Sequence, residues 1–154
     1  MTENKYTKTQ TIILVLLRLV IGYHFLYEGI DKLFAAHWTS AGFLAQSNWI
    51  FAGFFHALAD SQSLIGIIDF MNVWGQILIG LGLILGLFSR WAAIFGAVLI
   101  FFYYIAIPPF ITSYSFIDKN LFELFLFLIV AVFPTSKIIG IDLLIAKIRK
   151  PFCK

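Results

Sequence analysis

Five ionisable side chains lie close together in one apolar stretch near the N-terminus. The segment LRLVIGYHFLYEGIDKLF is hydrophobic enough to enter a bilayer, yet it contains Arg18, His24, Glu28, Asp31 and Lys32. A charged group near the bilayer centre costs roughly 2.5–3.5 kcal/mol on insertion scales, so these groups need partners or a function. A histidine and a carboxylate can exchange protons, and the cations can attract an anion.

Helical spacing places this set on one side of a helix. At about 100° per residue, one arc holds four of the five: His24, Glu28, Asp31 and Lys32. Arg18 lies at or just beyond its edge. A polar stripe is hard to sustain against lipid, so we expect it to face other helices or a wet cavity. Glu28 and Lys32 have the i,i+4 spacing of an ion pair.

Other apolar segments supply candidate partners for the stripe. We predict a catalytic, proton-handling set of three residues: His24, Glu28 and Glu123. The predicted substrate-binding side chains are Arg18, Lys32, Asn72, Gln76, Tyr103 and Asn120. Two carboxylates and a histidine could form a proton-coupled redox pocket, because a quinone takes up protons when it accepts electrons. The alternative is that they are polar contacts between helices, each worth about 0.6–2 kcal/mol.

The sequence contains no pattern typical of a metal centre or of thiol chemistry. His24 lacks an HxxxH or Cys/His set around it, so we favour a hydrogen-bonded packing role over metal ligation. Cys153 is the single cysteine and has no second thiol for a disulfide or a CxxC pair within the chain. We therefore expect no metal and no intrinsic cofactor.

The composition is typical of an integral membrane protein. Of the 154 residues, 61% are hydrophobic and 12% are charged, and the mean hydropathy is +0.94, far from the range of soluble domains. Since a spanning helix takes about 20 residues, the length allows a single domain, 1–154, of about four spans. The formal charge of +3 comes from basic residues concentrated in the tails. It indicates membrane topology, and we expect no nucleic-acid partner.

We predict an all-α, four-helix transmembrane bundle. Its spans are expected at about 11–34, 70–88, 91–107 and 120–137. Pro108 and Pro109 should end the third span, and Pro134 marks the exit of the fourth, because proline lacks the amide hydrogen that a helix needs.

The loop at 35–69 is predicted to form short helices at the membrane interface. A fifth crossing through the apolar stretch 41–59 is the alternative. It would place the polar residues 46–48 in lipid with few partners, which favours the interfacial arrangement.

Basic residues predict the orientation. Lys5 and Lys8 precede the first span, and Arg90 lies in the tight turn between the second and third spans. Further lysine and arginine residues follow the fourth span, whereas 35–69 contains no Lys or Arg. The positive-inside rule therefore places both termini in the cytoplasm. We expect the membrane to be a bacterial-type inner membrane. The tail 138–154 begins IIGIDLLIAKIRK, which predicts either an amphipathic helix on an anionic leaflet or a stop-transfer flank.

Four short motifs stand out along the chain. The first span matches RLxxGxxFLxxGxxKL from Arg18 to Leu33. Further matches are WTSAGFLA at 38–45, GLGLILGLFSRWAA at 80–93, and KNL at 119–121. In these motifs the chain resembles the DoxX/DoxD family of small membrane proteins. Gln76 stands where members of that family commonly carry a glutamate.

The resemblance implies a four-helix membrane bundle. For the DoxD branch it also implies the membrane subunit of a thiosulfate:quinone oxidoreductase, with quinone as the electron acceptor. Our first hypothesis is an accessory subunit of a membrane redox system that binds other subunits or a second copy. The second is the DoxD-type enzyme subunit, whose electrons would need a partner subunit or bound substrate, because the sequence has no haem-ligand pair or flavin signature. A small-solute transporter is the third, although four helices lack the usual inverted halves.

Overall fold

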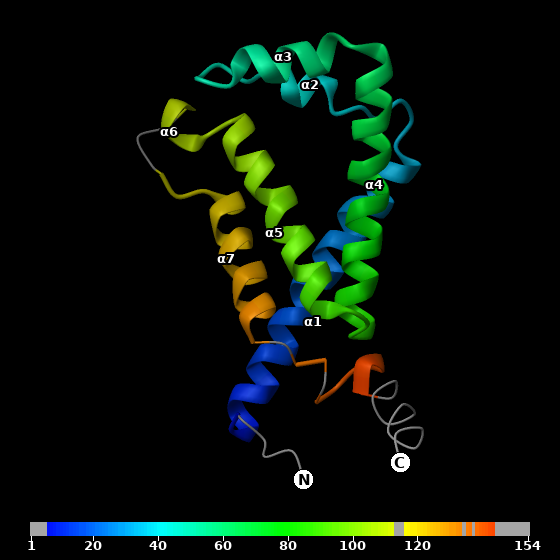
Figure 1. Cartoon of the computed structure of the whole chain (residues 1–154), viewed down its shortest axis with the longest axis vertical. Coiled ribbons are helices and arrows are strands. Elements are labelled where there is room, and N and C mark those ends of the chain that lie inside the picture. The colour runs from blue at the N-terminus through cyan, green and yellow to red at the C-terminus, as the bar shows by residue number, and fades with distance from the viewer. Residues whose placement is uncertain (1–5, 113–115, 134, 137, 144–154) are drawn as a thin grey trace, which may run out of the picture.

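The computed structural model describes residues 6–112, 116–133, 135–136 and 138–143. These residues contain helices and no strand, which confirms the all-α prediction. In chain order the helices are α1 (Lys8–Phe34), α2 (Ala41–Leu44), α3 (Ala52–Asp60), α4 (Gln62–Leu85), α5 (Ser89–Ala106), α6 (Pro109–Thr112) and α7 (Lys119–Val132), as labelled in Figure 1.

Three helices of the described chain are long and apolar enough to cross a membrane. They are α1, α4 and α5, with 27, 24 and 18 residues. Helix α7 has 14 residues and is about 21 Å long, shorter than the predicted fourth span at 120–137. It ends at Val132 because the next residue precedes Pro134, and a residue before proline is disfavoured in the helical conformation.

The second long helix starts earlier than its sequence predicted. We expected residues 62–69 to belong to the loop, but α4 begins at Gln62 and continues without a break to Leu85. It ends at Gly86, whose φ of +64° is left-handed and suits glycine. The tight turn that follows leads directly into α5, as expected from the short interval between the predicted spans 70–88 and 91–107.

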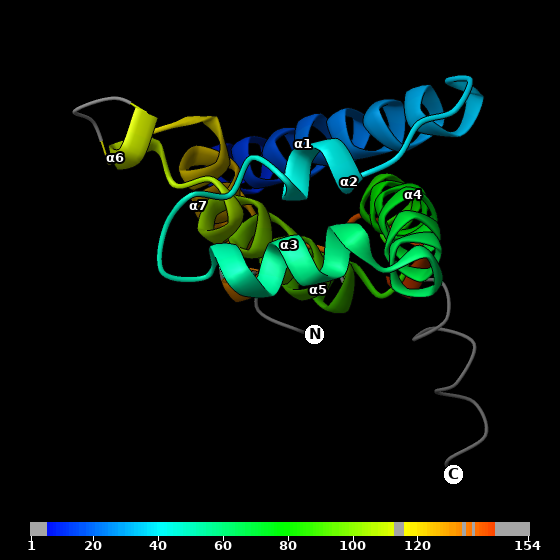
Figure 2. The same cartoon turned by 90° about the horizontal axis from the view of Figure 1, so that it is seen from above.

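Helices α2 and α3 lie across one end of α4 and α5 (Figure 1, Figure 2). With only 4 and 9 residues, neither can form the fifth crossing that we considered. The short-helix prediction for this segment is therefore confirmed. A small apolar cluster joins these helices to α5 through Leu44, Phe55 and Ala106. The start of α1 and residues 138–143 lie at the opposite end of the molecule (Figure 1).

The helices pack in two close pairs. Helix α1 packs on α4, where Gly22, Gly29 and Gly80 allow the backbones to approach. Helix α5 packs on α7, and the ring of Phe127 lies against Gly96. Between the pairs, Phe127 meets Phe25 of α1 edge to face, with ring centroids 4.6 Å apart. This apolar centre fixes the helices that carry the polar residues described next.

Candidate functional site

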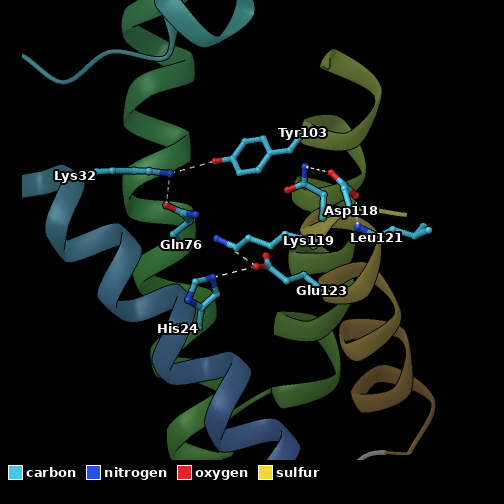
Figure 3. Close-up of polar contacts among 9 residues, drawn as sticks. His24, Lys32, Gln76, Tyr103, Asp118, Lys119, Leu121 and Glu123 are labelled. Carbon is cyan, nitrogen blue, oxygen red and sulfur yellow. Dashed lines mark hydrogen bonds and ion pairs between the residues drawn. The ribbon is translucent and has the colours of Figure 1, made fainter. Parts of the chain in front are cut away.

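Lys32 extends from the last turn of α1 toward α4 and α5. Its Nζ donates hydrogen bonds to Gln76 Oε1 at 2.8 Å, to Asn72 Oδ1 at 3.2 Å and to Tyr103 Oη at 3.4 Å. Figure 3 shows the side chains of Lys32, Gln76 and Tyr103 pointing toward one another from three helices. Four of the predicted substrate-binding residues therefore meet in one network.

The direction of these hydrogen bonds leaves Tyr103 with a donor to spare. Because the Asn72 oxygen accepts from the Lys32 ammonium, the Asn72 amide nitrogen faces Tyr103 and donates to its hydroxyl oxygen. That oxygen thus accepts from two donors. Its own proton has no acceptor in the part of the chain that the structure describes, so the Tyr103 hydroxyl can donate to a ligand.

The Lys32 ammonium is held by neutral groups. The predicted ion pair with Glu28 does not form, and no carboxylate of the described residues lies within 4.0 Å of Lys32 Nζ. Instead, Nζ lies 5.1 Å from the ring centroid of Trp38 and 5.5 Å from that of Tyr103. Aromatic faces attract a cation without neutralising it, so the positive charge remains available to a ligand.

These groups line a cavity of about 260 Å³. Its walls are formed by Lys32, Trp38, Thr39, Ser40, Phe43, Asn72 and Tyr103. Ser40 is fixed in the wall because both its amide and its hydroxyl donate to Asp69 Oδ1. The cavity thus combines an ammonium, hydroxyl and amide groups with aromatic faces, as small-molecule sites commonly do. We call it the Lys32 cavity.

A second polar group joins α1 to α7. Glu123 Oε1 lies 3.1 Å from His24 Nε2 and 3.5 Å from Lys119 Nζ, and Figure 3 shows both nitrogens directed at this carboxylate. Two of the predicted catalytic residues, His24 and Glu123, are therefore in contact. Glu28, the third, lies on α1 one turn after His24 and one turn before Lys32.

Three of the predicted substrate-binding residues do not line the Lys32 cavity. Gln76 reaches it only through its hydrogen bond to Lys32, and Asn120 and Arg18 lie elsewhere. The Asn120 amide donates to Asp118 Oδ2 at 2.8 Å, while Asp118 accepts from the Leu121 amide at 2.9 Å as the N-cap of α7 (Figure 3). Arg18 lies 14 residues before Lys32 on α1, which is about 21 Å along the helix. Asn120 thus has a position in a helix cap, and Arg18 is at the other end of the bundle.

Sequence reasoning did not assign four residues of the cavity walls to a site. All four, Trp38, Thr39, Ser40 and Phe43, belong to the WTSAGFLA motif, so the motif was the signal that could have identified them. Their approach to Lys32 depends on how the segment after α1 folds back over the end of the bundle. Among the described residues, no group of His, Cys, Asp and Glu side chains is arranged to hold a metal ion.

Arg18 holds the C-terminal segment against the bundle. It is only 2% exposed, and its Nη1 donates to Thr135 Oγ1 at 3.2 Å and to the carbonyl of Ile139 at 2.9 Å. Close by, Asp142 Oδ1 accepts from the amide of Phe88 at 3.0 Å. These contacts tie the described residues 135–136 and 138–143 to α1 and to the turn between α4 and α5.

Replacing Arg18 by methionine should loosen this segment. The variant loses two hydrogen bonds from a charged donor, and we expect a lower stability by about 1–3 kcal/mol, with faster amide exchange in 138–143. Hydrogen exchange followed by mass spectrometry measures the effect. Ligand binding in the Lys32 cavity should be unchanged. Unaltered exchange in 138–143 would contradict the anchoring role.

The fold and the site together define a small, polytopic helical membrane protein with a polar cavity between its helices. The family model DoxX matches residues 13–108, well over half of the chain, and the chain belongs to the DoxX family. The matched region contains every residue of the Lys32 cavity and ends before α7. No curated protein and no solved structure gave a significant match.

Proposed function

We propose that this chain is a quinone-binding subunit of a membrane redox system. The observation that carries the proposal is the Lys32 cavity, where an ammonium and the spare hydroxyl donor of Tyr103 meet aromatic walls. A quinone ring is planar and carries carbonyl acceptors without donors. A site for it needs hydrogen-bond donors for the carbonyls and aromatic faces for the ring.

The same donors favour the reduced form of the ring. Negative charge develops on the carbonyl oxygens when a quinone accepts electrons, and donors already directed at those oxygens stabilise it. The positive charge of Lys32 has no carboxylate contact in the described structure, so it adds to this effect. His24 lies two turns before Lys32 on α1 and contacts Glu123. This contact supports a role for the pair in delivering protons to the reduced quinone.

The electron donor in this proposal is a partner protein or a bound reductant, so the chain acts as a subunit. The proposed membrane is the bacterial-type inner membrane, with both termini in the cytoplasm. The start of α1 and residues 138–143 lie at the same end of the bundle (Figure 1). This supports placing both ends of the chain on the same side of the membrane. The Lys32 cavity then lies toward the outer surface, beneath α2 and α3.

Binding of a benzoquinone without a side chain tests the proposal. We expect the purified protein in lipid nanodiscs to bind it, and Tyr103→Phe to weaken binding by about two- to tenfold, the worth of one hydrogen bond. Phenylalanine keeps the ring and removes only the hydroxyl. Isothermal titration calorimetry measures both affinities.

Tyr104→Phe is the matched control for this measurement. Tyr104 is the next residue of α5, but its hydroxyl donates to the carbonyl of Phe116 at 3.0 Å and does not line the cavity. The Tyr104→Phe substitution should leave the affinity for benzoquinone unchanged. Absence of binding, or equal losses in both variants, would overturn the proposed function.

A further inference from the structure

An apolar groove continues from the Lys32 cavity. It has a volume of about 520 Å³ and is lined mainly by hydrophobic side chains of α3, α4 and α5, among them Leu58, Met71, Leu78, Phe95 and Phe102. The groove and the Lys32 cavity share four lining residues, which are Ser40, Phe43, Asn72 and Tyr103. One end of this combined space is therefore polar, and the remainder is apolar.

The sides of the groove are exposed on two helices that are long and apolar enough to cross a membrane. Met71 and Leu78 on α4 are 67% and 64% exposed, and Phe95 on α5 is 61% exposed. Both helices have the length and hydropathy to cross a bilayer, so these side chains meet lipid. The groove thus opens sideways, toward the hydrocarbon region.

We infer that the groove binds the alkyl or prenyl chain of a lipid-soluble quinone, which enters from the bilayer between α4 and α5. The inference rests on the proposed function, because the Lys32 cavity holds the ring. Because the polar cavity and the apolar groove are continuous, the combined space fits an amphiphile with a small polar head and a long apolar tail. A tail of this kind packs along the groove while its head reaches Tyr103.

Gly75 provides a way to close the groove without disturbing the helices. It lies in the groove wall on α4, and a Cβ atom built there meets no other atom within 4 Å. Gly75→Leu should therefore fill the groove and leave the packing of α4 intact. Gly66→Leu is the matched control, since Gly66 lies on the same helix, has the same open space and does not line the groove.

The experiment compares the ring without a side chain and the same ring with a decyl chain. Both ligands are titrated into nanodisc-embedded protein, because detergent chains would compete for the groove. We expect the wild-type protein to bind the decyl ligand about tenfold more tightly. Gly75→Leu should remove this difference and leave the affinity for the bare ring unchanged. Gly66→Leu should alter neither affinity.

The outcomes separate the two proposals. If the bare ring binds and Gly75→Leu does not weaken binding of the decyl ligand, the tail site is wrong and the ring site stands. If only the decyl ligand binds, and Gly75→Leu abolishes that binding, the tail site stands and the ring assignment fails. Binding of neither ligand overturns both. Circular dichroism and thermal unfolding of each variant confirm that it is folded.

Discussion

Replacement of Lys32 by methionine should reduce affinity for the bare benzoquinone ring more than any other change in the cavity. Hydrogen bonds from charged donors are worth about 1.5–3 kcal/mol, which corresponds to a loss of roughly 10- to 150-fold. Methionine retains an apolar stem beside Trp38 but has no donor. Calorimetric titration in nanodiscs gives the affinity, and thermal unfolding shows whether the variant folds.

A graded series makes this expectation specific. Lys32→Gln keeps an uncharged donor, so its affinity should fall between those of the wild-type and methionine variants. Lys119→Met removes another lysine of the polar region, but its side chain is 65% exposed and contacts Glu123 outside the cavity. That control should bind the ring like the wild-type protein. Equal losses at the two lysines would mean that overall charge, and not the Lys32 contact, governs binding.

The sequence predicted the helices well because apolar length dominates in a membrane. Of the four spans that hydrophobic runs indicated, three correspond to helices long and apolar enough to cross a membrane, and α5 ends before Pro108 as expected. The predicted second span begins after Asp69, whereas α4 begins seven residues before it, at Gln62. In the structure, Asp69 accepts hydrogen bonds from Ser40 and is tolerated inside the helix. A tertiary partner of this kind cannot be recognised from local hydropathy.

The site residues were recognisable individually, but their pairings were not. Lys32, Asn72 and Gln76 stood out because polar groups within apolar spans require partners. The local i,i+4 rule favoured Glu28 as the partner of Lys32, whereas the structure brings α4 and α5 to it instead. Pairing depends on how the helices cross, which side-chain spacing on one helix does not determine.

Arg18 shows that a long-range contact is not visible in the local sequence. Its place near the polar stripe on α1 led us to group it with the ligand-binding residues. It lies at the far end of the helix and contacts Thr135 and Ile139 of a segment more than 100 positions later in the chain. Nothing in the sequence around Arg18 indicated that the C-terminal segment would return to it.

Gly80→Ala should cause the largest loss of stability. A Cβ atom at this position would lie 2.6 Å from the amide nitrogen of Leu26 and 2.7 Å from the carbonyl oxygen of Gly22. Both are backbone atoms of α1, so no side-chain rotation can relieve the clash and the two helices must separate. Overpacking of this kind typically costs about 1–3 kcal/mol, and a backbone contact places the expected value at the upper end. Thermal unfolding in nanodiscs measures it.

The same substitution should also weaken ring binding, because Gln76 lies one turn before Gly80 and contacts Lys32 across the α1–α4 interface. Separation of these helices lengthens that contact and displaces Lys32 from the cavity. Gly66→Ala is the control, since it meets no atom within 4 Å and replaces glycine by a better helix former, which should raise stability slightly. Wild-type stability and binding in Gly80→Ala would show that the close α1–α4 approach does not position Lys32.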